Sequence, residues 1–544
     1  MGRSVRLSRA SAVRGTVASF ALLATMTLMG CPRDGSADRP ADGDSRSPHG
    51  TSARPTSPAG TTAAPGPPPV PGALPRTVPA VRSFSPAGGP GWRPAPGARV
   101  VAPDGPLADE GRRLAADLKL PFATGPAHSG DVELMLRPGQ SGGPESYRVE
   151  TRGRKATVTA PDEAGVFYGT RTVLQAVRTG GGIPEGTLSD RPDRPQRGLN
   201  LDIARKHFPA DWIEARLREM ADLKLNQLGL HFSDDQGFRI ESTSHPEIVS
   251  PQHLTKAEIR RIIDLASTLH ITVVPEIDSP GHLGAVMNSH PALQLRNASG
   301  TVARGAVDIA NAGSAAIVDD LIREYAALFP GPYFHLGADE YRALMAKDPE
   351  ASYPRLAEAA RQKYGPKARV QDLATGWLND RAAVVRSLGK TPKAWNDGFF
   401  TGGVVTPDKS IEVEYWTGKE IGARPPQEYL NEGRTLVNLN DEYLYYVLGQ
   451  PNQFVYPTGE RIYRQWSPAV LRGTAPVPTG PTGPDRIPGG RLAVWCDRPE
   501  AQTADQVAAG IRLPLAAVAQ RLWDPRVPRR TWPDFTALVG QVRR

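Results

Sequence analysis

The strongest constraint on the fold is a regular alternation of short apolar segments with longer amphipathic ones, which begins after residue 195. The apolar segments are typical of buried strands, and a stretch with helical spacing follows most of them. Eight such units favour a closed (β/α)8 TIM barrel over residues 195–544, with an open doubly wound sheet as the alternative. No G-x-G-x-x-G or Walker sequence opens a helix, which disfavours nucleotide-binding sheets. Strands are expected at 198–203, 227–232, 271–277, 333–337, 391–395, 411–416, 435–439 and 492–495, and helices at 212–223, 256–269, 315–328 and 373–388.

A smaller folded region is expected before the barrel, at residues 98–190. Its apolar segments are shorter, and helical spacing appears only twice, so the sequence predicts a small α+β domain. A Pro-rich turn at 191–195 separates it from the barrel. Its strands are expected at 100–102, 132–136, 147–150 and 156–160, and its helices at 107–118 and 163–177.

The first thirty residues have the layout of a secretory signal peptide. Basic residues precede an apolar stretch from Val17 to Met29, which is too short to span a bilayer as a helix. The stretch ends in Leu28-Met29-Gly30-Cys31, which resembles the bacterial lipobox, whose cysteine is lipidated and becomes the new N-terminus. An ordinary signal peptide with a chance cysteine is the alternative. The other cysteine, Cys496, is expected to pack in the core.

Proline and positive charge are concentrated near the N-terminus. Sixteen prolines lie between residues 31 and 100, so residues 31–97 are expected to form a disordered linker. Four arginines of the predicted signal peptide account for half of the net charge of +8. The remainder is weak evidence for a nucleic-acid partner, and none is expected. These features predict an exported protein on the extracellular face of the cell membrane, in contact with the membrane only through a lipid on Cys31.

Polar residues follow nearly every predicted barrel strand. A single polar strand end signifies little, because such residues often cap the next helix or form a turn. In barrels, however, the carboxyl ends of the strands converge on the active site, so these groups are expected to share one pocket. They are Asp202 and Arg205, His231 and Asp234, Asp278 and His282, His335, Asp339 and Glu340, Asn396 and Asp397, Asp441 to Tyr443, and Asp497.

Tryptophans near these strand ends indicate the kind of ligand. An indole ring offers a flat apolar face to the C–H face of a sugar, while carboxylates, Arg and His suit its hydroxyls. Each tryptophan alone is equally well explained as a core residue. Taken together and beside carboxylates, they favour a carbohydrate pocket. The four are Trp377, Trp395, Trp416 and Trp495.

The adjacent pair Asp339 and Glu340 indicates a particular chemistry. Most glycosidases need two carboxyl groups on either side of the scissile bond, about 5–5.5 Å or about 6.5–9.5 Å apart. Two carboxyl groups on adjacent residues of one strand end suit a different assignment of roles. One carboxyl acts as the acid, and the other holds a group of the substrate in place. Substrate-assisted hydrolysis, with a 2-acetamido oxygen as nucleophile, has this logic. The Asp and His residues lack His-x-His or His-Glu-x-x-His spacing, so no metal is expected.

The sequence resembles glycoside hydrolase family 20, the β-N-acetylhexosaminidases. The segment His335 to Glu340 is similar to the family's His-x-Gly-Gly-Asp-Glu, with Ala338 in place of the second Gly. Residues 165–169 resemble part of the family's second domain. The resemblance covers about residues 98–544 and implies a TIM barrel preceded by a small α+β domain. Its strongest segments are Arg197-Gly198, Leu201 to Arg205, His231 to Arg239, Pro275 to His282 and His335 to Glu340.

The resemblance also implies roles for single residues. Glu340 would be the general acid and then the general base, and Asp339 would accept the acetamido N–H and stabilise positive charge. Tyr443 would donate to the acetamido oxygen, and Arg197 would hold ring hydroxyls. Asp234, Asp278 and His282 would form a hydrogen-bonded support for Glu340. The substrate-binding set is completed by Trp377, Trp395, Trp416, Trp495 and Asp497.

Two positions depart from the family pattern. The family often has Tyr-Leu-Asp on the seventh strand and Trp-x-Glu on the eighth, whereas this chain has Tyr443-Leu444-Tyr445 and Trp495-Cys496-Asp497. The shorter Asp497 is expected to widen the pocket or weaken a contact with the terminal sugar. The Tyr-Leu-Tyr form resembles the dispersin-like hydrolases of β-1,6-linked poly-N-acetylglucosamine, but the segment after Glu340 lacks their Phe-Gly-Tyr.

The resemblance therefore implies a retaining exo-β-N-acetylhexosaminidase that removes terminal N-acetylglucosamine or N-acetylgalactosamine from an amino-sugar oligosaccharide or polysaccharide. No cofactor is expected, because the substrate supplies its own nucleophile. A dispersin-like hydrolase of β-1,6-poly-N-acetylglucosamine is the alternative within the family. A non-catalytic glycan-binding surface lipoprotein is the alternative from another class, and the pair Asp339 and Glu340 disfavours it.

Overall fold

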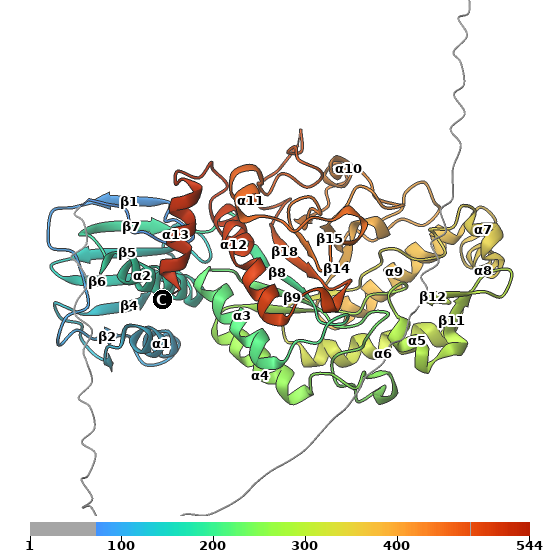
Figure 1. Cartoon of the computed structure of the whole chain (residues 1–544), viewed down its shortest axis with the longest axis horizontal. Coiled ribbons are helices and arrows are strands. Elements are labelled where there is room, and N and C mark those ends of the chain that lie inside the picture. Colours follow the sequence, from blue (N-terminus) through green and yellow to red (C-terminus); the bar gives the residue numbers. More distant parts are fainter. Residues whose placement is uncertain (1–71, 479, 544) are drawn as a thin grey trace, which may run out of the picture. The chain divides into compact units, whose positions relative to one another are not determined.

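The computed structural model describes residues 72–478 and 480–543 (Figure 1). The predicted signal peptide of residues 1–30, the predicted lipidation site Cys31 and residues 32–71 of the predicted linker lie outside the described residues. Within the described ranges, no helix has both the length and the apolar composition that a membrane crossing requires. A smaller and a larger sheet organise this part of the chain.

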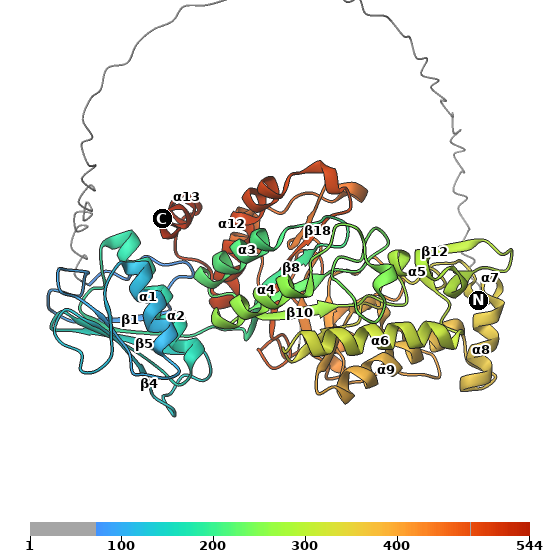
Figure 2. The same ribbon diagram turned by 90° about the horizontal axis from the view of Figure 1, so that it is seen from below.

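A mixed seven-stranded sheet forms the smaller domain, and two helices cover one of its faces (Figure 2). Its strands lie in the order β1 (Ser83–Pro86), β7 (Gly186–Asp190), β5 (Tyr147–Arg152), β6 (Lys155–Ala160), β4 (Val132–Leu136), β2 (Val100–Val101) and β3 (Phe122–Ala123), and its helices are α1 (Ala108–Leu118) and α2 (Glu163–Gly180). Helix α2 begins after Asp162, whose carboxylate accepts the Gly165 amide, and ends at Gly181 with a φ of 74°. Both caps satisfy backbone groups that a helix end otherwise leaves unpaired.

The smaller domain begins before residue 98. Strand β1 pairs antiparallel with β7, and Trp92 bridges to Ile183. Val78 and Trp92 are fully buried. The prediction that the disordered linker extends to residue 97 is therefore wrong. Pro86 makes this segment unlike a strand in the sequence, because proline lacks a backbone N–H. It is compatible with β1 because an edge strand has a hydrogen-bonded neighbour on one side only.

Eight parallel strands close into the predicted barrel, and β17 (Tyr445–Val447) adds a further strand beside β18. Strand β18 pairs with both β8 and β16, which closes the cylinder. The barrel strands are β8 (Gln196–Asp202), β9 (Gln227–His231), β10 (Thr272–Glu276), β13 (Tyr333–His335), β14 (Thr391–Trp395), β15 (Glu412–Tyr415), β16 (Leu436–Asn438) and β18 (Gly489–Trp495). Its longer helices are α3 (Ala210–Asp222), α4 (Lys256–Thr268), α6 (Ala312–Leu328), α9 (Val370–Ser387) and α12 (Ala504–Trp523).

The strand register brings polar residues into one row at the carboxyl end of the barrel. Asp202 of β8 lies opposite His231 of β9, and His231 lies opposite Glu276 of β10. Glu276 in turn lies opposite His335 of β13. Four neighbouring barrel strands therefore end in titratable side chains at the same height along the barrel axis.

The barrel interior is charged below this row. Arg491 of β18 and Glu414 of β15 form a fully buried ion pair, and Lys393 Nζ lies 3.1 Å from Glu414 Oε1. Buried charges of this kind are tolerated only when each has a partner, because an unpaired buried charge is costly. The interior therefore holds a connected set of charges that ends at the carboxyl row.

Candidate active site

The polar strand ends converge on one cavity. It has a volume of about 550 Å³ and lies at the carboxyl ends of the barrel strands. Its lining combines carboxylates, basic groups and aromatic rings. Of the predicted site residues it includes His282, Asp339, Glu340, Trp416, Trp495 and Asp497, and among its further lining residues are Arg205, Asp441, Tyr445 and Phe454.

The turn that carries Glu340 leaves β13 in a left-handed conformation. The φ angles are 68° at Gly337, 83° at Ala338 and 47° at Glu340. Gly337 must lack a side chain, because a Cβ there would lie 1.6 Å from Asp278 Oδ1. The Ala338 amide donates to the same oxygen at 3.1 Å. Non-glycine residues adopt such φ values at an energetic cost, and strain of this kind gathers at functional sites, where the surroundings hold it.

His282 lies among the carboxylates of the site. Its Nε2 is 3.5 Å from Glu340 Oε2 and 3.7 Å from Asp339 Oδ2. Its Nδ1 is 3.4 Å from Asp234 Oδ2, and that oxygen is 2.9 Å from His231 Nε2. One imidazole thus connects the buried Asp234 to the two carboxylates that line the cavity.

This arrangement sets the protonation of the site. Burial opposes a charge on His282, but the carboxylates around it, Asp234 foremost, raise the pKa of the imidazole well above its usual value. The hydrogen bond with His282 lowers the pKa of the Glu340 carboxyl. Burial raises the pKa of Asp339 and of Asp278, and a neighbouring carboxylate adds to each shift, Glu340 at Asp339 and Asp339 at Asp278. A charged His282 therefore holds Glu340 ionised in the free protein, while Asp278 and Asp339 keep a proton more readily.

Asp339 presents an acceptor that its neighbours do not use. Its Oδ1 is buried and has no hydrogen-bond partner among the described residues. Buried polar atoms are nearly always paired, because desolvation without a compensating hydrogen bond is costly. A ligand with an N–H group, placed beside Glu340, would satisfy this oxygen.

Aromatic rings form the floor and a wall of the cavity. Trp416 and Tyr445 stack in parallel with ring centroids 5.6 Å apart, and Tyr445 is 5.8 Å from Trp495. Trp395 packs 5.8 Å from Trp495 and is only 1% exposed. Its indole N–H donates to Glu276 Oε1 at 2.8 Å. Trp416 and Trp495 thus offer faces to a sugar ring, whereas Trp395 supports them from beneath and does not line the cavity.

The structure corrects the role predicted for Arg197 and adds Arg205. Arg197 lies near the amino end of β8, is fully buried, and pairs with Glu145 of the smaller domain at 2.7 Å. It does not reach the cavity, so the prediction that it holds ring hydroxyls is wrong. Arg205 lies past the carboxyl end of the same strand, lines the cavity and pairs with Asp234 at 2.6 Å. The rule that barrel sites form at carboxyl strand ends was the signal that favoured Arg205.

The structure also places Tyr443 outside the cavity lining, for a different reason. Its side chain is almost fully buried, its ring lies 4.4 Å from the Arg461 guanidinium, and its hydroxyl donates to Gln465 Oε1 at 3.4 Å. Tyr445 lines the cavity instead. Tyr443 sits in a turn, where its amide donates to the Asn440 carbonyl, so strand alternation does not place it on the same face as Tyr445.

Trp377 also lies outside the cavity lining. It is on α9, and its indole N–H donates to Ser279 Oγ at 3.1 Å. The Arg381 guanidinium lies over its ring at 4.5 Å. The ring is 4% exposed and packs the helix against the segment after β10, and its contact with substrate stays a prediction.

Asp497 occupies the place where the family commonly has a glutamate. It follows β18 and lines the cavity together with Arg205. Burial raises the pKa of its carboxyl, while the positive charge of Arg205 acts in the opposite direction. Asp497 is therefore a candidate contact for ligand hydroxyls beside Arg205.

Two groups of side chains in this region have atoms close enough to hold a cation, within 4.8 Å of one another. The first joins His231, Glu276 and Asp278, and the second joins Asp278, His282 and Asp339. Each group already contains an imidazole beside a carboxylate: His231 Nδ1 lies 3.1 Å from Glu276 Oε2, and His282 Nε2 lies 3.7 Å from Asp339 Oδ2. We therefore assign these residues to the protonation network of the site.

Comparisons with known proteins agree with this geometry. The profile of glycosyl hydrolase family 20, catalytic domain, matches residues 195–526, and that of glycosyl hydrolase family 20, domain 2, matches residues 74–191. Among curated proteins, a lacto-N-biosidase of Bifidobacterium bifidum is 30% identical over 484 residues, which cover 87% of this chain and 42% of that protein. A β-N-acetylhexosaminidase of Cellulomonas fimi is 27% identical over 454 residues, 75% of this chain and 80% of that protein. The chain thus spans about two fifths of the length of the Bifidobacterium relative.

Solved structures give the same result. A family 20 β-N-acetylhexosaminidase of Streptomyces coelicolor superposes with a TM-score of 0.68 at 26% identity, over 87% of this chain and 96% of the other. A mutant β-hexosaminidase of Streptomyces plicatus in complex with its product GlcNAc superposes with a TM-score of 0.70 at 27% identity, over 88% of this chain and 96% of the other. The barrel, the domain that precedes it and the sequence profiles together show that this chain belongs to glycosyl hydrolase family 20.

Proposed function

We propose that the chain is a retaining β-N-acetylhexosaminidase that uses the 2-acetamido group of its substrate as the nucleophile. The observation that carries the proposal is the pairing of two neighbouring carboxyl groups with different surroundings. Glu340 faces the cavity beside His282, whereas Asp339 offers a buried oxygen that no described residue hydrogen-bonds. The first suits proton transfer, and the second suits a hydrogen bond from an acetamido N–H.

The reaction would proceed in two steps. In the first, the acetamido oxygen attacks the anomeric carbon while the glycosidic C–O bond breaks, and Glu340 gives its proton to the leaving oxygen. Asp339 accepts the acetamido N–H and stabilises the positive charge of the oxazolinium that forms. In the second, Glu340 takes a proton from a water whose oxygen attacks the anomeric carbon and opens the oxazolinium ring. Two inversions at that carbon retain its configuration.

The remaining lining residues suit substrate placement. Trp416 and Trp495 would pack on the sugar, and Arg205 and Asp497 would bind its hydroxyls. Tyr445 replaces Tyr443 as the candidate donor to the acetamido oxygen, because it lies in the cavity lining. A binding protein without catalysis would not require a strained turn to present Glu340, so this alternative is not favoured.

Substitution of Glu340 by Gln tests the mechanism. We expect kcat for substrates with poor leaving groups to fall about 10²- to 10⁴-fold, because the amide cannot donate the proton. Substrates with an activated aryl leaving group should suffer less in the first step. A thiazoline analogue of the oxazolinium should inhibit the unsubstituted enzyme tightly. Unchanged kcat in the variant, or no inhibition by the analogue, would contradict the mechanism.

The number of sugars released per cleavage is a separate question. Removal of one terminal sugar is our first proposal, and release of a disaccharide is the second. The second is favoured by the Bifidobacterium relative, whose name is lacto-N-biosidase, and by Asp497, which is one methylene shorter than glutamate. A shorter side chain leaves more room beyond the first sugar. Product analysis on three kinds of substrate would decide. GlcNAc released from chitobiose or from β-1,6-linked oligomers supports the first proposal. An intact disaccharide released from lacto-N-biose-terminated oligosaccharides supports the second.

We further propose that the enzyme is exported and anchored to the outer face of the cell membrane through Cys31. The support is in the sequence, where four arginines, an apolar stretch and Leu28-Met29-Gly30-Cys31 follow in order. Mass spectrometry of the mature N-terminus should find a lipid-modified Cys31. A Cys31→Ser variant should appear in the culture medium or remain unprocessed. An unmodified mature N-terminus at another residue would contradict the proposal.

A further inference from the structure

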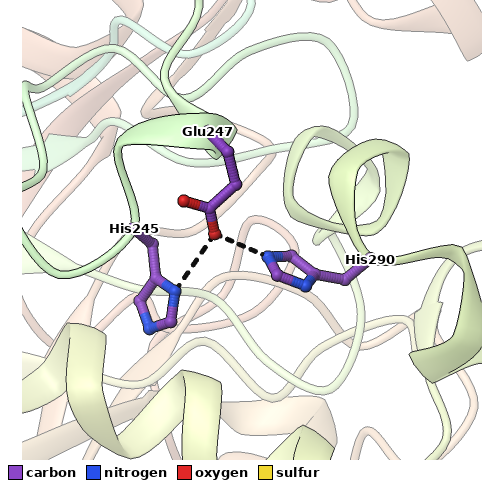
Figure 3. A group of neighbouring side chains, drawn as sticks. All are labelled: His245, Glu247 and His290. Atoms are coloured by element: carbon purple, nitrogen blue, oxygen red, sulfur yellow. Dashed lines mark hydrogen bonds and ion pairs between the residues drawn. The ribbon is translucent and has the colours of Figure 1, made fainter.

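Two histidines and a glutamate meet on the barrel surface outside the candidate active site (Figure 3). His245 precedes the short helix η1 (Pro246–Ile248), which carries Glu247, in the loop after β9. His290 follows the short helix α5 (Gly284–Ser289), which comes shortly after His282 in the chain. Both imidazoles point at one oxygen: His245 Nδ1 lies 3.2 Å from Glu247 Oε1, and His290 Nε2 lies 2.8 Å from the same atom.

These separations are close to those of a tetrahedral metal site. Zinc binds imidazole nitrogen and carboxylate oxygen at about 2.0–2.2 Å, which places two ligand atoms about 3.3 Å apart in a tetrahedron. The three ligand atoms of His245, Glu247 and His290 all lie within 4.8 Å of one another. Small side-chain movements would therefore let a single ion replace the two hydrogen bonds to the Glu247 oxygen.

The surroundings of His245 match those of a metal-bound histidine. A histidine that binds metal through one ring nitrogen usually directs the other toward a carboxylate or carbonyl, which fixes the ring. His245 Nε2 is buried and has no hydrogen-bond partner among the described residues, and it faces Asp320 Oδ2 of α6 at 3.6 Å. The His245 amide donates to Ser242 Oγ at 3.0 Å, which holds the backbone of the first ligand.

We propose that His245, Glu247 and His290 bind one divalent transition-metal ion, with zinc as the best match. Two imidazoles and one carboxylate select zinc and similar ions over calcium or magnesium, which prefer oxygen ligands. Glu247 is 44% exposed, so an ion can enter from solvent and a water can complete the coordination. The ion would lie on the outside of the barrel and would take no part in glycoside hydrolysis.

The position of the site gives the ion a structural role. The loop after β9 carries Asp234 and Asp235 at its start and the two ligands His245 and Glu247 further on. It already contacts α5, because the Gly284 amide donates to Asp235 Oδ1 at 2.9 Å and Ser289 Oγ donates to the Glu247 carbonyl at 2.7 Å. An ion on His290 would add a third connection between the two segments and would hold the supports of His282 and Asp234 in place.

Zinc binding to the whole chain tests the proposal. After treatment with a chelator and removal of the chelator, the protein should be titrated with zinc chloride by calorimetry, and bound metal should be counted by elemental mass spectrometry. We expect a His245→Ala/His290→Ala variant to bind one ion fewer per chain than the unsubstituted protein. A matched control is His253→Ala in the same loop, whose Nδ1 faces the Ser250 carbonyl and not the cluster, and it should bind as many ions as the unsubstituted protein.

Further variants separate this site from the candidate active site. Glu247→Gln keeps the shape of the side chain but removes its charge, so zinc affinity should fall while the fold is retained. A thiazoline inhibitor that fills the cavity should leave zinc binding at His245 and His290 unchanged. Zinc should raise the thermal unfolding midpoint of the unsubstituted protein and of His253→Ala more than that of the double variant. Equal zinc stoichiometry in the double variant and the unsubstituted protein would overturn the proposal, as would loss of the ion only in His282→Ala.

Discussion

The two ends of the barrel hold cavities of nearly equal volume, about 560 Å³ at the amino ends of the strands and about 550 Å³ at the carboxyl ends. The first is lined by Glu145 and by residues at the beginnings of strands, among them Gln196 and Tyr333. The second gathers Arg205, Asp339 and Glu340. Cavity size therefore does not distinguish the reactive end of this barrel, and the arrangement of charges does.

Strand β8 shows the contrast within a single element. Arg197 near its amino end pairs with Glu145 and holds the smaller domain against the barrel. Arg205 past its carboxyl end pairs with Asp202 and Asp234 but still lines the cavity. Arg197 is fully buried in its ion pair with Glu145. Arg205 also forms ion pairs, but part of its guanidinium remains available to a ligand in the cavity. Only the substitution at Arg205 should therefore affect the kinetics.

The largest effect is expected at the carboxyl end, from Arg205→Ala. Loss of this guanidinium removes a candidate ligand for sugar hydroxyls and leaves Asp234 with one positive neighbour fewer. We expect kcat/KM to fall about 10²-fold or more. The thermal unfolding midpoint should fall as well, because the buried carboxylates of Asp202 and Asp234 each lose a positive partner. Arg205→Lys should recover only part of the activity, because an ammonium group lacks the planar fork. Wild-type kcat/KM in Arg205→Ala would show that the cavity does not use this residue.

At the amino end, Arg197→Met should lower stability without a change in the kinetics. Removal of one partner leaves the Glu145 carboxylate half-buried and unpaired, which costs about 3–5 kcal/mol of unfolding free energy. KM and kcat of the folded enzyme should remain unchanged. Urea denaturation measures the unfolding free energy, and initial rates below the unfolding temperature measure KM and kcat. The double variant Arg197→Met/Glu145→Gln should recover part of the lost stability. An increase in KM in Arg197→Met would contradict the placement of Arg197 away from the cavity.

The third prediction concerns pH. Glu340 must be protonated to act as an acid, so kcat/KM falls as pH rises through its pKa. The hydrogen bond with His282 lowers that pKa. In His282→Gln the pKa of Glu340 should rise, and the basic limb of the kcat/KM profile should move to higher pH. His253→Gln is the control and should leave the profile in place. A basic limb that stays in place, or moves to lower pH, in His282→Gln would contradict the proposed link.

The smallest effect is expected from Trp377→Phe. The substitution removes the hydrogen bond to Ser279 Oγ and part of a buried ring, so we expect a loss of about 1–2 kcal/mol of stability. KM should not change, because the ring does not line the cavity. The comparison is Trp416→Phe at the cavity wall, where KM should increase. A similar rise in KM for both variants would place Trp377 in substrate binding after all.

The sequence is a good guide to the barrel, because periodicity and strand-end chemistry act locally. The expected strand at 391–395 coincides with β14, and the helix expected at 256–269 differs from α4 by one residue at its end. Asp339 and Glu340 are found in the cavity lining because their motif fixes both residue type and place in the strand order.

The errors in the site arise where side-chain direction depends on three-dimensional context. Tyr443 and Tyr445 differ by two residues, and the turn before β17 decides which of them faces the cavity. Arg197 is the second residue of β8 and Arg205 follows its carboxyl end, and the ion pair with Glu145 shows where the first side chain points. Trp92 and strand β1 were missed because their pairing partners lie about one hundred residues away.

The left-handed turn after β13 has a consequence for how this sequence can vary. Ala338 carries a methyl group at a φ of 83°, and a Cβ on Gly398 would lie 2.8 Å from that methyl carbon and 2.7 Å from the Ala338 carbonyl oxygen. Positions 338 and 398 therefore share one small volume, although they come from different barrel strands. Glycine at position 338 would remove only the contact with the methyl carbon, because the carbonyl oxygen belongs to the backbone. Position 398 therefore stays glycine whichever small residue occupies position 338, and any redesign of this turn must begin from that constraint.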